Sequence, residues 1–554
     1  MAALAGAACG PGDTSAPPAP AAVPVLSSAA AADLATAIAA RLASPTGIAA
    51  RDRTDLAELY APGGHAPLWL DPSGRPDAEA HTALGLLASA LDDGLVPDDY
   101  GASRLSAQAA TLTGPGVSLA TMAGFDVGLS RGMLLYMRHL HLGRIDPRAI
   151  GFHLTVPPDG HEFVPLLRDA LAGGHLAGMV AALRPPLALY AALRARLGDY
   201  RRLAADVSLA DVSALPVSLD PGDVSGDLAP LARRLSALGD LPPGDAALPA
   251  AGVYAGALVD AVRRFQVRHG LEPDGVIGKR TSRELSMPLA WRVRQIEFSL
   301  ERLRWLPDLN KGRVVFVNIP MFHLWAWEAA DADLAPSLEA GVIVGEALDH
   351  QTPVFVEDMR YLVFRPYWNL PRSIVETETL PAIAADPGYL ARQDMELVRG
   401  GGDDARPVPA TAENLARLAA GELRVRQRPG PKNALGLVKF VFPNDEAVYL
   451  HDSPAAGLFA EARRDFSHGC VRVERPAALA GWVLRDQAEW TPRAIAAAMR
   501  AGDNRVVPLA TPVQVVLAYL TAMVDPSDGA MRFADDLYDH DTRLDAALHE
   551  PRLR

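Results

Sequence analysis

Apolar residues recur at spacings of three and four along residues 31–225, between short breaks that contain proline or glycine. The stretch EAHTALGLLASALDDGL, residues 79–95, is an example. This spacing is that of one face of an α-helix, so each run predicts a helix with a buried side. We therefore expect a helical scaffold domain over 31–225, in which Trp69 and Tyr100 are core anchors rather than ligand contacts.

A second helical unit is expected over residues 226–290. Residues 258–287, LVDAVRRFQVRHGLEPDGVIGKRTSRELSM, have the pattern of a helix, a tight turn and a second helix. Gly275 and Gly278 lie in the turn, where glycine is favoured because it readily adopts positive backbone angles. The pattern predicts a small, compact helical domain.

The pattern changes after Leu300, where β-branched and aromatic residues alternate with polar ones in runs bounded by Gly, Pro, Asn and Asp. Such runs predict strands, and FVFPNDEAVYLHD, residues 440–452, is typical of a hairpin. Residues 291–510 are expected to form a mostly β, sandwich-like domain. Residues 373–430 within it are polar and helix-like, which suggests a helical cap, because most connections are far shorter.

The remaining residues, 511–554, predict a long apolar strand and a tail that packs on the β domain or on the scaffold domain. The fold class is therefore multidomain α+β. It combines a helical scaffold domain, a small helical domain and a mostly β domain with a helical cap insertion.

Composition excludes some partners. The net charge of −13 is spread without long blocks of like charge, so we expect no nucleic-acid partner. No stretch beyond the N-terminus approaches the roughly 18 consecutive apolar residues of a membrane span. Residues 1–30 are interpreted as a signal remnant or a disordered linker, and membrane association is expected only through them. Whether Cys9 is lipidated or removed with such a signal stays open.

Cys470 is a candidate for chemistry, because two cysteines in 554 residues are too few for a disulfide framework. A free thiol has a pKa of about 8.5, so it needs a base or a positive field to react at neutral pH. His451 ends the expected hairpin, and residues 452–466 are long enough to return the chain beside it. One close imidazolium could lower the thiol pKa to about 7. Cysteine with histidine is the minimal pair for acyl transfer, and no metal or cofactor is required.

Gly469 fits the same chemistry. A glycine directly before the nucleophile permits a sharp turn and brings main-chain N–H groups close to a developing oxyanion. A lone thiol is more often a small buried hydrophobe, and only the full set of neighbours favours a catalytic role over that interpretation.

Residues 451–473, HDSPAAGLFAEARRDFSHGCVRV, resemble the catalytic motif of the L,D-transpeptidases, whose catalytic domain is of the YkuD type. That motif is a histidine, a gap of about fifteen residues, Ser/Thr-His-Gly-Cys, a hydrophobic residue and a polar one. Some members carry asparagine where this sequence has Arg472. The order of domains also resembles that of the large Gram-negative members. The residues in register are His451, Ser467, His468, Gly469, Cys470, Val471 and Arg472.

The resemblance implies the reaction and the roles. Cys470 would attack the third residue of a peptidoglycan tetrapeptide stem, a diamino acid, release D-alanine and pass the acyl group to an amine of another stem. His451 would be the general base and acid, oriented by a carbonyl such as that of Asp452. Main-chain amides around Gly469 and Cys470 would bind the oxyanion. As a separate hypothesis, the cap insertion over the thiol would exclude water. Residues implied to shape the loop or to line the donor site are Ser467, His468, Arg472, Tyr449 and Trp368.

Residues 226–290 resemble the peptidoglycan-binding-domain-like family, a three-helix module in which a helix ends in FQ and DGxxG precedes the next helix. Either this module binds the wall or it is a compact connector without a binding groove. The matching residues are Phe265, Gln266, Asp274, Gly275 and Gly278.

Other functions stay open. The same thiol chemistry would serve an L,D-carboxypeptidase or an enzyme that attaches a protein lysine to the wall. A non-catalytic wall-binding scaffold is another possibility, and Asn433 either braces a turn or touches substrate. A general cysteine protease is disfavoured, because no recognisable motif supplies an orienting Asn or Asp. The expected location is the periplasm or cell envelope, and the expected partners are peptidoglycan stem peptides and other cell-wall synthesis enzymes.

Overall fold

The computed structural model describes residues 25–44, 50–114, 116–154, 162–209, 218–225, 228–242, 252–309, 312–328, 335–348, 350–401 and 405–549. The expected signal remnant up to residue 24 and Cys9 lie outside the described residues. The described chain divides into two compact units. Among the described helices, none has the length and apolarity needed to cross a bilayer.

The first unit is a helical bundle, as the apolar spacing predicts. Its centre is the buried carboxylate of Asp126, which accepts hydrogen bonds from the Tyr60 hydroxyl at 2.5 Å and from the Trp69 N–H at 2.9 Å. Burial raises the pKa of Asp126 to about 6. Trp69 and Tyr100 are buried, which confirms them as core anchors. The helices of this unit are α1 (Ser28–Ala43), α2 (Ala50–Tyr60), α3 (Ala78–Ala88), α4 (Ala102–Leu112), the first part of α5 (Leu119–Leu142) and α6 (Phe163–Gly173).

The second unit contains the small helical domain and the β domain. Its helices include α8, which packs along α12 through leucine side chains of one shared core. The predicted scaffold domain, 31–225, therefore contributes a helix to the packing of the β domain. The helices are α7 (Leu176–Ala182), α8 (Ala188–Ala205), α9 (Ala229–Ala237), α10 (Ala257–Arg268), α11 (Lys279–Ser286), α12 (Leu289–Arg304), α17 (Pro476–Val483), α18 (Pro492–Arg500) and α19 (His540–His549).

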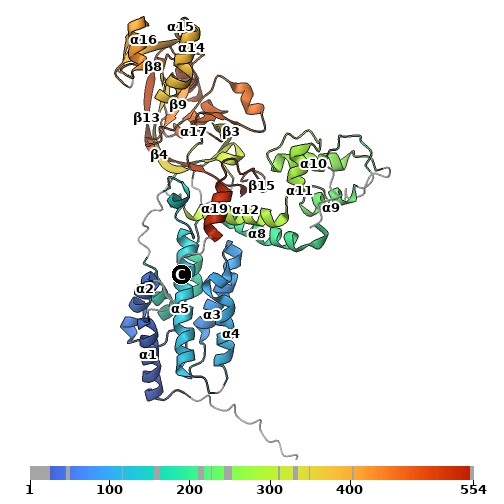
Figure 1. Ribbon diagram of the computed structural model, residues 1–554, viewed down its shortest axis with the longest axis vertical. Helices are drawn as coiled ribbons and strands as arrows, with labels where there is room; N and C mark the ends of the chain where they lie inside the picture. The colour runs from blue at the N-terminus through green and yellow to red at the C-terminus, as the bar shows by residue number, and fades with distance from the viewer. Residues whose placement is uncertain are drawn as a thin grey trace, which may run out of the picture. The chain divides into compact units, whose positions relative to one another are not determined.

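Helices α9, α10 and α11 form the small domain (Figure 1). Gln266 is its internal polar link: it is 1% exposed, donates to Asp274 Oδ1 at 2.8 Å and accepts from the Gly275 N–H at 2.8 Å. Gly275 has φ of +80°, and a Cβ there would lie 2.7 Å from Val259, so both conformation and space require glycine. Gly278 has φ of −87°, so the positive backbone angle expected there was wrong.

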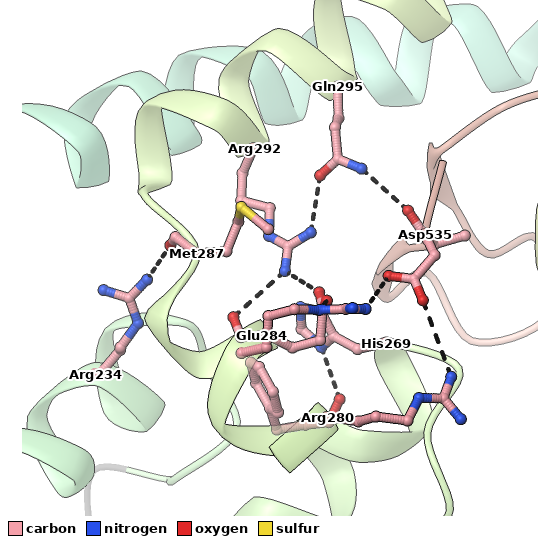
Figure 2. Close-up of polar contacts among 11 residues, drawn as sticks. Arg234, His269, Arg280, Glu284, Met287, Arg292, Gln295 and Asp535 are labelled. Carbon is pink, nitrogen blue, oxygen red and sulfur yellow. Dashed lines mark hydrogen bonds and ion pairs between the residues drawn. The ribbon is translucent and has the colours of Figure 1, made fainter. Parts of the chain in front are cut away.

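Buried polar contacts join this domain to α12 and to the C-terminal segment (Figure 2). Arg292 lies between Glu284 and Gln295, and the Gln295 amide donates to the Ala534 carbonyl at 3.1 Å. An ion pair of 2.8 Å between Arg283 and Asp535 adds a second link. The small domain is thus fixed to the same body as the β domain.

The β domain is confirmed as mostly β, but its strands form one sheet that closes on itself, where a sandwich-like arrangement was expected. The order is β11-β3-β12-β10-β9-β4-β13-β1-β2, and β3 also pairs with β2. Closure leaves few free edges and places the apolar side chains inside. The strands are β1 (Val314–Asn318), β2 (His323–Trp327), β3 (Leu338–Gly345), β4 (Phe355–Phe364), β9 (Val438–Val441), β10 (Leu450–His451), β11 (Asp465–Ser467), β12 (Val471–Val473) and β13 (Arg505–Ala518).

The cap insertion is a small α/β body with its own core, where the sequence pattern predicted only helices. The sequence pattern did not predict its strands. Charged residues interrupt the alternation of apolar and polar positions, and each strand is only two to five residues long. Helices α14, α15 and α16 gather with β8 beyond the main sheet (Figure 1). The elements are β5 (Trp368–Asn369), α13 (Arg372–Ile374), a π-helical turn (Val375–Thr379), α14 (Leu380–Ala385), α15 (Tyr389–Arg392), β6 (Met395–Arg399), β7 (Arg406–Val408), α16 (Ala412–Ala419) and β8 (Arg424–Gln427).

The C-terminal segment completes the second unit. β13 crosses the expected boundary at residue 510 and pairs with both β1 and β4, so it belongs to the main sheet. The hairpin of β14 (Ala522–Val524) and β15 (Met531–Phe533) packs on α12 and α8, and α19 also packs on α12. A buried ion pair between Arg302 of α12 and Asp541 of α19 fixes this contact.

Gln266→Leu should destabilise the small domain. Leucine keeps the approximate size but leaves the buried N–H of Gly275 without its acceptor, which costs about 1–3 kcal/mol. Asp260→Asn on the exposed face of α10 is the matched control, with an expected change within about 0.5 kcal/mol. Chemical denaturation of the full chain measures both, and equal effects would contradict an internal role for Gln266.

Candidate active site

Strand register places five polar side chains on one face of the sheet. β10 pairs in parallel with β12, so Leu450 lies opposite Val471 and His451 opposite Arg472. Leu450 and Val471 are fully buried in the core. Because side chains alternate along a strand, the neighbours of these core residues point to the opposite face. The residues on that face are His451 of β10, Arg472 of β12, Lys439 of β9, which pairs with His451, and the residues that directly precede β10 and β12, Tyr449 and Cys470.

Cys470 and His451 are thus diagonal neighbours on adjacent strands. The register thus brings the imidazole and the thiol to the same face of neighbouring segments. The imidazole is 4% exposed, and its Nδ1 lies 2.5 Å from the carbonyl oxygen of Asp452. A carbonyl only accepts, so Nδ1 carries the proton and Nε2 is left as the basic atom. The expected contact with the Asp452 carbonyl is present, and its orienting role in a reaction stays a prediction.

The charges around the pair favour a neutral resting state. Burial, with a smaller contribution from the cations of Arg472 and Lys439, lowers the pKa of His451 to about 3. Burial raises the pKa of the Cys470 thiol, although Tyr449, Lys439 and Arg472 act in the opposite direction. The sequence suggested that one imidazolium would lower the thiol pKa to about 7. That was wrong for the free protein, because desolvation outweighs the nearby positive charges.

The loop that presents Cys470 is held by side chain and backbone together. Gly469 has φ of +106°, a conformation that favours glycine, as the sequence predicted. Ser467 is 2% exposed; its hydroxyl donates to the Cys470 carbonyl at 2.5 Å and accepts from the Gly469 N–H at 3.2 Å. Ser467 therefore shapes the loop and presents no free hydroxyl to a substrate.

The expected substrate-lining residues occupy different places. Trp368 and Arg472 both line a cavity of about 300 Å³ between the cap and the sheet, together with Lys432 and Ser453. Arg472 is half-buried and donates to the Phe466 carbonyl at 3.3 Å. Tyr449 lies beside the thiol instead, with the Lys439 ammonium 3.5 Å from the centre of its ring. The roles of these residues toward a substrate stay predictions.

The cap contacts the catalytic loop directly. His468 Nε2 lies 2.7 Å from Glu378 Oε1, and Glu378 belongs to the π-helical turn of the cap. The His468 ring also contacts the ring of His350, with the centroids 4.6 Å apart. Asn433 braces the exit from the cap: it is fully buried and its amide donates to the Pro366 carbonyl at 3.0 Å.

Sequence reasoning missed Lys439 and Glu378 at this site. Lys439 sits one strand away from His451, and its position on the same face follows only from the β9–β10 register. Glu378 is far from His468 in sequence, and no motif marks it. The alternation of apolar and other residues in 438–441 indicated that Lys439 points away from the core. No comparable pattern in the sequence marked Glu378.

The residues of the small domain that match the wall-binding signature lie apart from the thiol site. Phe265 and Gln266 are 1% exposed and serve the domain's own core, while Asp274 is exposed. A larger cavity, of about 990 Å³, lies between this domain, α12 and the C-terminal segment, and none of the expected catalytic residues lines it. Cys470 and His451 do not line the smaller cavity under the cap either, but Arg472, which lies on their face of the sheet, does. Among the described residues, no group of three His, Cys, Asp or Glu side chains could hold a metal ion.

Three family models match successive parts of the chain. Residues 54–197 match the family model "Scaffold domain", residues 225–285 match "Putative peptidoglycan binding domain", and residues 312–515 match "L,D-transpeptidase catalytic domain". A protein of Haemophilus influenzae named "Putative L,D-transpeptidase" is 33% identical over 255 residues.

That alignment covers 46% of this chain and 50% of the relative, so the chain spans about half the length of the curated protein it matches. The matched catalytic region contains Cys470, His451 and the whole cap. Residues 312–515 are therefore similar to an L,D-transpeptidase catalytic domain, and the residues before them are similar to a scaffold domain and a peptidoglycan-binding domain.

Proposed function

We propose that the protein is a peptidoglycan L,D-transpeptidase of the periplasm or cell envelope, with Cys470 as its nucleophile. The observation that carries the proposal is the placement of Cys470 and His451 on one face of paired strands, with the Nδ1 proton of His451 committed to a carbonyl. The match of residues 312–515 to the catalytic domain supports it.

The first half-reaction follows from the protonation states. His451 Nε2 removes the thiol proton as Cys470 Sγ attacks the carbonyl of the third residue in a tetrapeptide stem. The negative charge on sulfur develops beside Lys439 and Arg472, which stabilise it, and the oxyanion meets a main-chain N–H of the loop. The C–N bond to D-alanine then breaks, its nitrogen takes the proton from His451, and a thioester remains.

The second half-reaction reverses these roles. The side-chain amine of another stem attacks the thioester, His451 accepts the amine proton, and the sulfur leaves and regains a proton. The product is a cross-link between two diamino acid residues. Water or a protein lysine would follow the same path, so an L,D-carboxypeptidase and a protein-to-wall enzyme remain the rival functions.

The cap favours transfer to an amine over hydrolysis. Its π-helical turn contacts the residue two positions before the nucleophile, and the cavity beneath it is bounded by Trp368, Tyr389 and Arg472. A closed cap over the thioester would exclude bulk water while the acceptor stem is in place.

Cys470→Ala should abolish D-alanine release and cross-linking, and His451→Ala should lower both by about 10²–10⁴-fold, the usual contribution of a general base. His549→Ala, an exposed histidine in α19, is the control and should retain full activity.

Intact-mass measurement with a carbapenem checks the nucleophile: the parent gains an adduct and Cys470→Ala does not. A parent protein without adduct or turnover would favour a non-catalytic scaffold.

Alkylation of Cys470 by iodoacetamide should rise with pH to an inflection above the ordinary thiol value of about 8.5, because burial raises the thiol pKa. Lys439→Met removes one stabilising cation and should move the inflection higher still. Alkylation rates followed by mass spectrometry across neutral to alkaline pH measure both. An inflection below neutral pH would indicate a resting thiolate–imidazolium pair instead.

Glu378→Ala should increase the fraction of thioester lost to water by up to about five-fold, the range that one exposed ion pair supports. Glu376→Ala is a matched control in the same turn, since Glu376 pairs within the cap with Arg372 at 2.6 Å. The ratio of D-alanine released to cross-links formed is the measurement. An unchanged ratio in Glu378→Ala would remove the basis for a water-excluding cap.

A further inference from the structure

Two hydroxyl groups behind the catalytic loop form a short relay of hydrogen bonds. The Thr352 hydroxyl accepts from the Gly345 N–H at 2.9 Å and donates to the Gly469 carbonyl at 2.8 Å. The Tyr538 hydroxyl accepts from the Thr352 N–H at 3.2 Å and donates to the Gly345 carbonyl at 2.7 Å. Each hydroxyl has one proton to donate, so each bond has a fixed direction.

This relay is enclosed. Thr352 and Tyr538 are each 1% exposed. The end of β3 is pressed against the loop, since a Cβ at Gly345 would lie 1.8 Å from the His350 carbonyl oxygen and 3.0 Å from Gly469 Cα. Burial raises the pKa of Tyr538 to about 12, so its hydroxyl keeps the donated proton at neutral pH. A buried and fully paired arrangement of this kind permits little rotation.

The relay determines where the N–H of Cys470 points. The peptide between Gly469 and Cys470 is planar and trans, so its C=O and N–H point in opposite directions. Thr352 holds the carbonyl toward the interior, and the N–H of Cys470 is therefore directed away from the interior, toward the side of the thiol. The N–H of Gly469 donates to the Ser467 hydroxyl. The N–H of Cys470 is therefore the hydrogen-bond donor of the loop that is directed toward the thiol side.

We propose that Thr352, braced by Tyr538 of the C-terminal segment, is a positioning residue that aims the Cys470 N–H at the oxyanion of the acyl-transfer intermediate. The inference rests on the proposed function. It assigns a role in the reaction to two residues outside the His451–Cys470 motif, and one of them lies beyond the matched catalytic region, 312–515.

Two reagents separate this role from support of the thiol itself. A carbapenem acylates Cys470: the Sγ–C bond forms through a tetrahedral oxyanion, the lactam C–N bond breaks, and the nitrogen takes the proton. Iodoacetamide alkylates the same sulfur by displacing iodide, and no oxyanion forms. Substitution of a residue that positions an oxyanion donor should therefore slow acylation by the carbapenem and leave alkylation by iodoacetamide unchanged.

Thr352→Val should slow acylation by about 10–100-fold, a part of the 10²–10³ that one oxyanion donor supplies. Alkylation should stay within about two-fold, and Thr352→Ser should restore acylation because it restores the hydroxyl. With stem peptide, the loss should fall on kcat and leave KM nearly unchanged. Equal slowing of both reagents, or no slowing of either, would overturn the proposal.

Tyr538→Phe provides a second, gentler variant, because it removes only the hydroxyl. Acylation should slow by several-fold with alkylation unchanged. Tyr254→Phe is the matched control: its buried hydroxyl donates to the Gly275 carbonyl at 2.6 Å in the small domain, away from the thiol. Equal acylation rates in Tyr538→Phe and Tyr254→Phe would contradict the role of Tyr538. The proposed function is judged separately, on cross-linking by the parent protein.

Discussion

The parallel pairing of β10 with β12 is the constraint on which the active site depends. One register places Leu450 and Val471 in the core, and the same register places His451 and Cys470 together on the opposite face. A shift by one residue would turn the imidazole into the apolar core and move leucine out of it to the opposite face, which the packing of a closed sheet strongly opposes. Hydrophobic packing therefore fixes the geometry of the polar site, although no apolar residue takes part in the chemistry.

Burial and charge act against each other at the thiol. Desolvation keeps both Cys470 and His451 neutral, while Lys439 and Arg472 supply positive charge that becomes useful once the sulfur gives up its proton. A neutral pair in the free protein is less reactive toward chance oxidants than a standing thiolate. The nucleophile forms as it attacks, so its reactivity is coupled to the arrival of a substrate carbonyl.

Local patterns in the sequence were enough to predict the helical bundle, the β9–β10 hairpin and the candidate pair Cys470 and His451. Contacts between distant segments were not predictable in this way. The strands of the cap insertion were not predicted because they are short and contain charged residues. Thr352 and Tyr538 were not predicted because no sequence motif includes them. The thiol pKa was also misjudged, since spacing reveals which residues are near but not how far each is desolvated.

The hydrogen bonds of Tyr538 to the loop beneath the thiol have a consequence for biosynthesis. A chain is made from its N-terminus onward, so Cys470 exists before the segment that braces its loop has been synthesised. The nascent protein would then hold an immature nucleophile with an unaimed amide. The proposed oxyanion site is therefore complete only after the C-terminal segment has packed against the loop.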